Sequence, residues 1–463
     1  MIQSFKNIWS IPDLRRRVLY TFGLLAVYRI GGHIPTPGID NQALIRLFER
    51  QAGSILGYVD LFAGGNFRRF TVFALGIMPY ITASIILQLL TVVWPYLEKL
   101  SKEGEAGRKK ITQWTRYGTV ALSVIQSYGI ALWLQSASAG GAERIVLNPG
   151  IGFQMMTMLT LTTGTAFIMW LGEQISERGI GNGISLIIFA GIVVGFPNAV
   201  VRTWEDLRTG QLGPLAVLML LALMAVVVAA IVLVERAQRK IPIQYARRIV
   251  GRRVYGGAST YLPLRVNTGG VIPVIFASSM LAIPQTLLTF RWLQDIRWVQ
   301  DLHRQLEYSA PLYNVLYFVM IIFFCFFYVS IIFNPMDQAD NMKKYGGFIP
   351  GIRPGRKTAE YIDRILTRLT FGGAIYLGLV SILPVFLISG LRLQVLPWIG
   401  PAMEPYLPKL ITQGLNVKFF FGGTSLLIVV GVAMDTVQQI ESQLIMRHYE
   451  GFMKGARIRG RRG

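Results

Sequence analysis

The chain has 463 residues, of which 52% are hydrophobic and only 15% are charged. Soluble domains carry about 25% charged residues, so the composition excludes an ordinary soluble protein and indicates that lipid is the solvent. A net charge of +22 is typical of nucleic-acid-binding proteins, but the basic cytoplasmic loops of a membrane protein explain it as well. The single cysteine, Cys325, excludes an internal disulfide framework.

Ten segments are apolar enough to cross a bilayer, which takes about 20 residues of helix. In chain order the eight clearest windows are 71–94, 117–137, 151–171, 179–201, 214–234, 269–290, 312–333 and 369–391. Two weaker windows, 18–34 and 419–440, contain Arg29 and Asp435 near an end, where a charged group can reach the headgroups. The sequence therefore predicts an all-α polytopic membrane protein with ten transmembrane helices.

Basic residues divide unevenly between the two sides of these spans. If both termini lie on one side, that side holds 32 of the 46 Lys and Arg residues, which leaves 14 for the other side. The positive-inside rule assigns the basic side to the cytoplasm. We therefore expect both termini to be cytoplasmic, which requires an even number of spans.

Two basic loops, 235–268 and 334–368, are expected on the cytoplasmic side. At roughly thirty residues each, they exceed the usual connection between helices. Attraction to anionic lipid is one explanation of their charge. A docking surface for a cytosolic partner, such as an RNA-containing one, is the other. The turn 350–355 favours docking, because its prolines and glycines form a stiff support that presents Arg353.

No motif for catalysis or cofactor binding is present. His33, His303 and His448 are scattered, so we expect no metal site, and no GxxxxGK[ST] motif marks a nucleotide site. The candidate intramembrane acids, Glu173 and Asp435, both lie close to a cytoplasmic end. A solute carrier needs convergent polar groups at the midplane, so the sequence favours a channel over a carrier. A membrane-embedded enzyme has no catalytic constellation to support it.

Seven segments, in order and spread over nearly the whole chain, match one family of membrane proteins. They are 74–84, 104–109, 170–174, 177–185, 269–273, 351–355 and 421–428. In these segments the chain resembles the SecY family, the central subunits of the bacterial Sec protein-conducting channel. The resemblance implies two inverted halves of five spans, 1–210 and 211–463, around an hourglass pore, an arrangement common among transport folds.

The resemblance also implies a pore ring of aliphatic side chains. The ring maps onto Ile77, Ile81, Ile188, Ile275 and Ile428. A closed aliphatic ring excludes water and ions by dewetting, yet it binds no passing side chain strongly. Any one of these isoleucines is more often packed in a core or against lipid, so only the joint match favours a ring.

A plug near 58–70 is implied as well, blocking the external funnel and moving aside during transport. Its mapped residues are Leu61, Phe62, Ala63, Gly64 and Gly65. Glycine costs about 1 kcal/mol in a helix interior, so the composition predicts a short, breakable helix. An ordinary extracytoplasmic loop is the alternative.

A lateral gate between spans 2–3 and 7–8 would admit signal peptides and release membrane spans into lipid. Polar residues that lie in those spans are Thr82, Gln88, Ser278 and Ser279. They are candidates for pairing across the gate, and ordinary interhelical hydrogen bonding is the alternative.

The resemblance finally implies partners for a passive conduit that has no energy source of its own. Arg239, Lys240 and Arg353 would contact the motor ATPase SecA or the ribosome, because acidic surfaces and RNA phosphates suit these cations. Small membrane subunits of the SecE and SecG type, signal peptides and nascent polypeptides complete the expected partners. The expected location is the bacterial plasma (inner) membrane.

Overall fold

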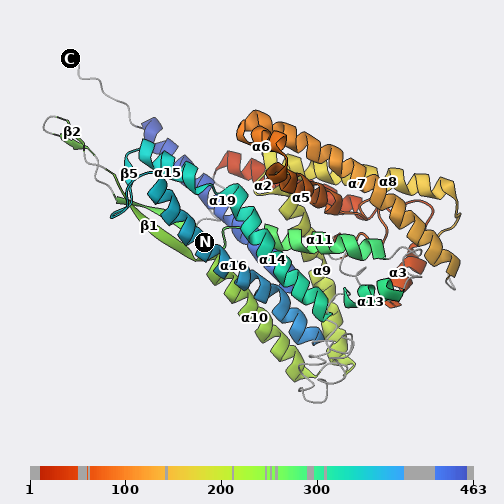
Figure 1. Cartoon of the computed structure of the whole chain (residues 1–463). Coiled ribbons are helices and arrows are strands. Elements are labelled where there is room, and N and C mark those ends of the chain that lie inside the picture. The colour runs from red at the N-terminus through yellow and green to blue at the C-terminus, as the bar shows by residue number, and fades with distance from the viewer. Residues whose placement is uncertain are drawn as a thin grey trace. The chain divides into compact units, whose positions relative to one another are not determined.

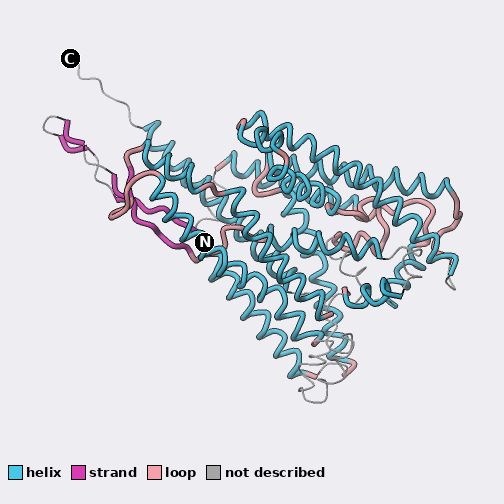
Figure 2. Tube along the Cα trace, viewed as in Figure 1, coloured by secondary structure: helices cyan, strands magenta, loops and turns pink. Residues whose placement is uncertain are grey.

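The computed structural model describes residues 11–50, 60, 63–140, 144–210, 213–245, 248–250, 253–255, 259–288, 297–306, 310–390 and 423–455. Figures 1 and 2 show that these residues are mainly helical, with a small β-structure near β1. The chain divides into two compact units. The first contains Met1–Val200, Thr286–Asp295 and Val432–Gly463, and the second contains Val201–Gln285 and Ile296–Gly431.

Among the residues that the structure describes, the named elements of the first unit are helices. They are α2 (Pro12–Gly31), α3 (Asn41–Arg50), α5 (Met78–Val93), α6 (Pro95–Lys102), α7 (Glu105–Gly140), α8 (Ile151–Arg178) and most of α9 (Gly183–Arg208). The last helix, α19 (Gly423–Gly455), begins in the second unit and ends in the first.

The second unit combines helices with short strands. Its helices are α10 (Pro214–Arg236), most of α11 (Ile272–Leu288), α13 (Arg297–Gln305), α14 (Pro311–Ile332), α15 (Pro335–Lys344) and α16 (Arg356–Ser389). Its strands are β1 (Gln238–Tyr245), β2 (Arg248–Val250), β3 (Arg253–Tyr255), β4 (Ser259–Arg265) and β5 (Gly347–Phe348).

The helical membrane architecture predicted from the sequence is confirmed. Each of the ten apolar windows overlaps a helix. Among the described residues, six helices are long and apolar enough to span a bilayer, and a seventh span results if α5 and α6, which are bent by 100° at their junction, count as one. A total of ten spans stays a prediction.

The window 71–94 differs from the prediction at its start, because Thr71 forms an isolated β-bridge with Pro35, residues 72–77 form turns, and α5 begins only at Met78. The turns lie against α8. A Cβ atom on Gly164 would overlap the carbonyl oxygen of Val72, so only glycine permits this close approach. Gly76 has a φ of 57°, in the left-handed region that favours glycine, and it ends the turns just before the helix.

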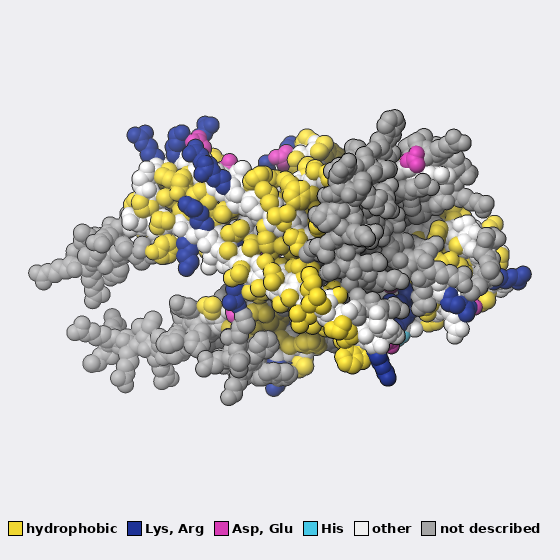
Figure 3. All heavy atoms as spheres, turned by 90° about the horizontal axis from the view of Figure 1, so that it is seen from below, with side chains coloured by type: hydrophobic (Ala, Val, Ile, Leu, Met, Phe, Trp, Pro, Cys, Tyr) yellow, Lys and Arg dark blue, Asp and Glu magenta, His cyan; other side chains and the backbone are white. Residues whose placement is uncertain are grey.

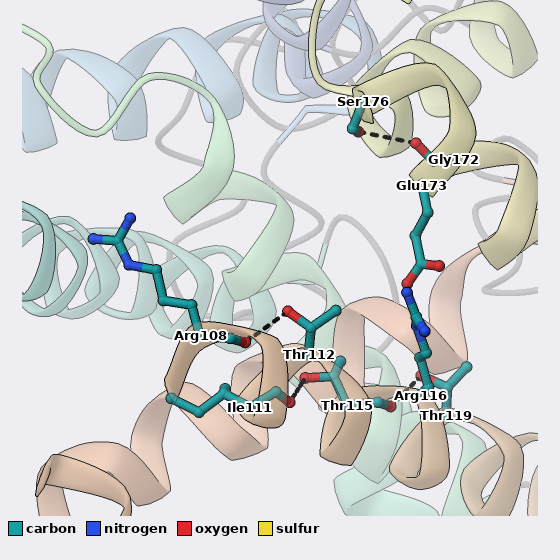
Figure 4. Close-up of polar contacts among 9 residues, drawn as sticks. All are labelled: Arg108, Ile111, Thr112, Thr115, Arg116, Thr119, Gly172, Glu173 and Ser176. Atoms are coloured by element: carbon teal, nitrogen blue, oxygen red, sulfur yellow. Dashed lines mark hydrogen bonds and ion pairs between the residues drawn. The ribbon is translucent and has the colours of Figure 1, made fainter. Parts of the chain in front are cut away.

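Helix α7 packs against both α5 and α8, and it contains a row of buried small polar residues. Thr115, Thr119, Ser123 and Ser127 are spaced four apart and are at most 5% exposed. Each hydroxyl donates to a carbonyl oxygen of its own helix, as Figure 4 shows for Thr115 and Thr119. Because these hydroxyls are satisfied within α7, they can be buried in a membrane bundle without an unpaired polar group.

An antiparallel sheet with the strand order β4-β1-β5 joins the two basic loops, an arrangement that was not predicted. Gln238 to Gln244 of β1 pair with Arg265 to Ser259 of β4, and Gln244 pairs with Phe348 of β5. The sheet packs on α15 and α16 through buried apolar side chains. These are Ile241, Ile243, Leu264, Met342, Ile349 and Ile362.

Apolar side chains cover much of the described surface, as the view in Figure 3 shows. On α10, the exposed side chains include Leu215, Leu218, Leu221 and Leu233, with exposed fractions of 59–72%. Exposed leucine over the length of an apolar helix is costly in water but not in hydrocarbon. This face of α10 is therefore suited to contact lipid.

Candidate pore, plug and docking sites

The five isoleucines of the predicted ring are all buried, with exposed fractions of at most 4%. Ile77 and Ile81 lie on α5, Ile188 on α9, Ile275 on α11 and Ile428 on α19. Their burial excludes the alternative that these side chains face lipid, since the lipid-suited leucines of α10 are more than half exposed. The joint ring stays a prediction.

The first two ring residues lie one turn apart on α5. Ile77 is the N-cap of the helix, and the Ile81 amide donates to its carbonyl oxygen over 3.1 Å. Residues spaced by four share a helix face. Ile77 and Ile81 therefore belong to the same side of the first turn of α5.

The predicted plug is described only in part, since Leu61 and Phe62 lie outside the described residues. Residues 63–70 form consecutive turns, so the expectation of a short helix is wrong for this part. Gly64 and Gly65 have φ values of 70° and 79°, and such values do not continue a right-handed helix.

Gly64 packs directly against α9. A Cβ atom on Gly64 would come within 2.8 Å of the Cα atom of Gly191, so the approach needs glycine at position 64. The Tyr28 hydroxyl of α2 donates to the carbonyl oxygen of Ala63 over 3.4 Å, and the Asn66 amide donates to the Tyr28 hydroxyl over 3.3 Å. These contacts fix residues 63–66 between α2 and α9 within the first unit.

Asp60, a 5% exposed carboxylate just before these turns, was not among the predicted site residues. Its Oδ1 atom accepts from the Arg68 amide over 2.8 Å, and its carbonyl oxygen accepts from the Gly65 amide over 2.9 Å. Burial raises the pKa of Asp60, while the hydrogen bond and charge of Arg68 act in the opposite direction. Its signal in the sequence is a single acidic residue within an otherwise apolar and glycine-rich stretch.

The four candidate gate residues are buried or half-buried on α5 and α11. Ser278 and Ser279 both donate to the carbonyl oxygen of Ile275 over 2.8 Å, and Gln88 donates to Ser84 over 3.2 Å within α5. Thr82 is 5% exposed. These three hydrogen bonds therefore stay within single helices, and pairing across a gate stays a prediction.

The three predicted docking residues, Arg239, Lys240 and Arg353, are exposed. The turn that presents Arg353 is held at both ends, with φ values of 81° at Gly351 and 101° at Gly355. The Thr358 hydroxyl donates to the carbonyl oxygen of Arg353 over 3.0 Å. Because β5 pairs with β1, the structure joins both basic loops into one folded surface, which we call the basic platform (238–245, 259–265 and 335–368).

A second buried acid was also missed. Glu235, at the end of α10, accepts a hydrogen bond from the Asn267 side chain over 2.6 Å, and both residues are at most 6% exposed. In the sequence, Glu235 is the first residue after the apolar run 214–234. A buried partner 32 residues further along the chain leaves no local signal in the sequence.

Sequence comparison places the chain among bacterial translocase subunits. The SecY family model matches residues 71–437. The chain is 48% identical to protein translocase subunit SecY of Escherichia coli (strain K12) over 459 residues, which is 99% of this chain and 97% of that protein. It is 44% identical to the Aquifex aeolicus (strain VF5) protein of the same name, over 98% of this chain and 100% of that protein.

Solved structures share the fold. One described as a protein conducting channel aligns with a TM-score of 0.62 and 17% identity, covering 93% of this chain and 92% of that chain. Sec61 in the canine ribosome-channel complex aligns with a TM-score of 0.58 and 16% identity over the same shares. The fold, the matching family model and the identity over the full length lead to one conclusion: the chain belongs to the SecY family.

Proposed function

We propose that this chain is the channel subunit through which unfolded secretory polypeptides cross a bacterial plasma membrane. Its relatives are named protein translocase subunits, and its fold is that of a protein conducting channel. The proposal includes release of transmembrane segments sideways into lipid, through a gate that contains Thr82, Gln88, Ser278 and Ser279.

The burial of all five ring isoleucines supports this proposal most directly. Five aliphatic side chains kept from lipid on four helices suit a dewetted constriction, which stops ions without binding the translocated chain. The plug would add a second seal, with Gly64 seated against α9 when the channel rests.

The proposed channel is a passive conduit and not an enzyme, so a partner must supply the energy. The exposed basic platform suits the acidic surface of a motor such as SecA, or the phosphates of ribosomal RNA. One relative in structure, canine Sec61, is described in a ribosome complex. We further propose cytoplasmic termini, inverted halves at 1–210 and 211–463 around an hourglass pore, and small subunits of the SecE and SecG type.

Serine substitutions in the ring test the function. Replacing Ile81, Ile188, Ile275 and Ile428 by serine should let water enter the constriction, so resting channels in planar bilayers should conduct ions. Ile187→Ser is the matched control, because Ile187 is also buried on α9 but packs near Gly172 of α8. If the four-serine channel conducted no more ions at rest than wild type, the assignment of these isoleucines to a pore ring would be wrong.

A further inference from the structure

The basic hairpin of β1 and β4 meets the membrane helices at two buried polar side chains. Glu235 lies in the last turn of α10, just before β1, and Asn267 lies between β4 and α11. The Asn267 Nδ2 atom donates to Glu235 Oε1 over 2.6 Å. A buried carboxylate is costly unless it is hydrogen-bonded, so this contact is part of what allows Glu235 to be 6% exposed.

Asn267 makes a second hydrogen bond, to the start of α11. Its Nδ2 atom also donates to the carbonyl oxygen of Gly270 over 3.1 Å. Gly270 has a φ of 60°, which favours glycine, and it lies two residues before α11 begins at Ile272. One side-chain amide thus connects the end of α10 to the start of α11.

The backbone around this pair leaves little room for independent movement. The Val266 amide donates to the carbonyl oxygen of Ala237 over 3.0 Å, next to the strand pair of Gln238 and Arg265. On the other side, a Cβ atom on Gly373 of α16 would come within 2.7 Å of the Val266 carbonyl oxygen. Close packing of this kind transmits displacement from one element to the next.

We propose that Glu235 and Asn267 are positioning residues that transmit displacement of the basic hairpin to α11. The inference rests on the proposed function, because α11 contains Ile275 of the proposed ring and Ser278 and Ser279 of the proposed gate. Without the two hydrogen bonds of Asn267, the hairpin keeps its strand pairs and its apolar core. A displacement of the hairpin then no longer moves the start of α11. A docked partner can therefore displace the hairpin without opening the channel.

A pair of apolar substitutions separates positioning from stability. Asn267→Leu leaves the buried Glu235 carboxylate without the amide donor, so both thermal stability and transport should fall. Glu235→Leu combined with Asn267→Leu removes the buried carboxylate together with its amide donor, so part of the stability lost in Asn267→Leu should return. Glu235→Gln keeps an acceptor for Asn267 and should behave as wild type. Thr268→Ala is the matched control, since Thr268 donates only to the nearby Arg265 carbonyl oxygen.

The full chain is reconstituted in vesicles with its small membrane subunits, SecA, ATP and a preprotein. Thermal unfolding, SecA binding and preprotein transported per bound SecA are measured. The double-leucine variant should unfold at a higher temperature than Asn267→Leu and bind SecA within about twofold of wild type, yet transport at least about fivefold less per bound SecA, as expected for lost coupling. Recovery of both stability and transport would overturn the inference.

A third variant covers failure of the double variant to assemble. Glu235→Leu alone removes the acceptor on α10 while Asn267 keeps its hydrogen bond to Gly270, so it should show the same loss of transport per bound SecA. Wild-type transport by this variant also overturns the inference. If the wild-type chain itself transports no preprotein, the proposed function fails, and the inference fails with it. If only the inference fails, the wild-type chain still binds SecA and transports preprotein, and the variants transport as much per bound SecA as wild type does.

Discussion

The Arg116 guanidinium of α7 and the Glu173 carboxylate of α8 form an ion pair, with 2.7 Å between Nε and Oε1. Figure 4 shows the two side chains extending toward each other from their helices. Glu173 is 15% exposed and Arg116 is 44% exposed, and Tyr80 of α5 lies close enough to interact with both charges. The pair accounts for a carboxylate that the sequence analysis considered as an intramembrane acid: Glu173 holds α7 and α8 together.

Charge reversal tests this role. Arg116→Glu or Glu173→Arg alone places like charges side by side and should lower the unfolding temperature of the purified complex. A hydrogen bond to a charged group contributes about 1.5–3 kcal/mol, but the exposed half of Arg116 reduces this to about 1 kcal/mol. The double exchange should recover most of the loss. If the loss of stability in the double variant equalled the sum of the losses in the two single variants, the two side chains would not interact.

The seat of the plug is tested by comparing two neighbouring glycines. Gly64→Ala and Gly65→Ala both place a Cβ atom at positive φ, which costs about 1–2 kcal/mol in each case. Only at position 64 does the new atom meet a neighbour, Gly191, and such overpacking adds about 1–3 kcal/mol. Gly64→Ala channels should therefore leak more ions at rest than Gly65→Ala channels in planar bilayers. If the two variants leaked ions equally, the contact between Gly64 and Gly191 would not contribute to the seal.

The sequence predicted the helices well because spans depend on a local property, the length of an apolar run. The windows 214–234 and 312–333 nearly coincide with α10 and α14. The sheet was not predicted, although its signal was present: Ile241, Ile243 and Tyr245 alternate with polar or exposed residues, which is the period of a half-buried strand. The alternation extends over only the eight residues of β1, and the basic charge around it is equally typical of a cytoplasmic loop.

Other features depend on contacts that a single sequence does not reveal. Glu235 and Asn267 are 32 residues apart, and Gly64 and Gly191 are more distant still. Neither pair leaves a pattern of hydropathy or spacing, since each follows from how helices pack. The ring isoleucines could be proposed only by resemblance, because an isoleucine in an apolar helix is equally suited to lipid, to a core or to a pore.

Stability near the plug should depend on pH through Asp60. Burial raises the pKa of its carboxyl in the folded protein above the ordinary value, so the protonated form is favoured on folding. Its contribution to stability is therefore fully present below the ordinary carboxyl pKa and is lost as pH rises through the raised value. Asp60→Asn removes this titration while keeping an acceptor for the Arg68 amide.

The unfolding temperatures of wild type and Asp60→Asn test this sign. At neutral pH the variant should be at least as stable as wild type, because it avoids burying a charge. On acidification toward about pH 4, the stability of the wild-type protein should rise relative to that of the variant. Asp60→Ala, which lacks the acceptor for Arg68, should be the least stable at every pH. If acidification lowered the unfolding temperature of wild type relative to that of Asp60→Asn, the result would contradict the raised pKa of Asp60.

Two charge reversals decide between the explanations for the basic platform. Arg353→Glu and Arg364→Glu alter the net charge equally, and both residues are exposed in the same segment. Attraction to anionic lipid depends on total charge at about 1 kcal/mol per basic residue, so it predicts equal effects. Docking predicts a larger effect at Arg353, because the turn between Gly351 and Gly355 fixes its position. SecA-dependent export into vesicles should therefore fall further for Arg353→Glu, and equal losses in the two variants would assign the platform to lipid.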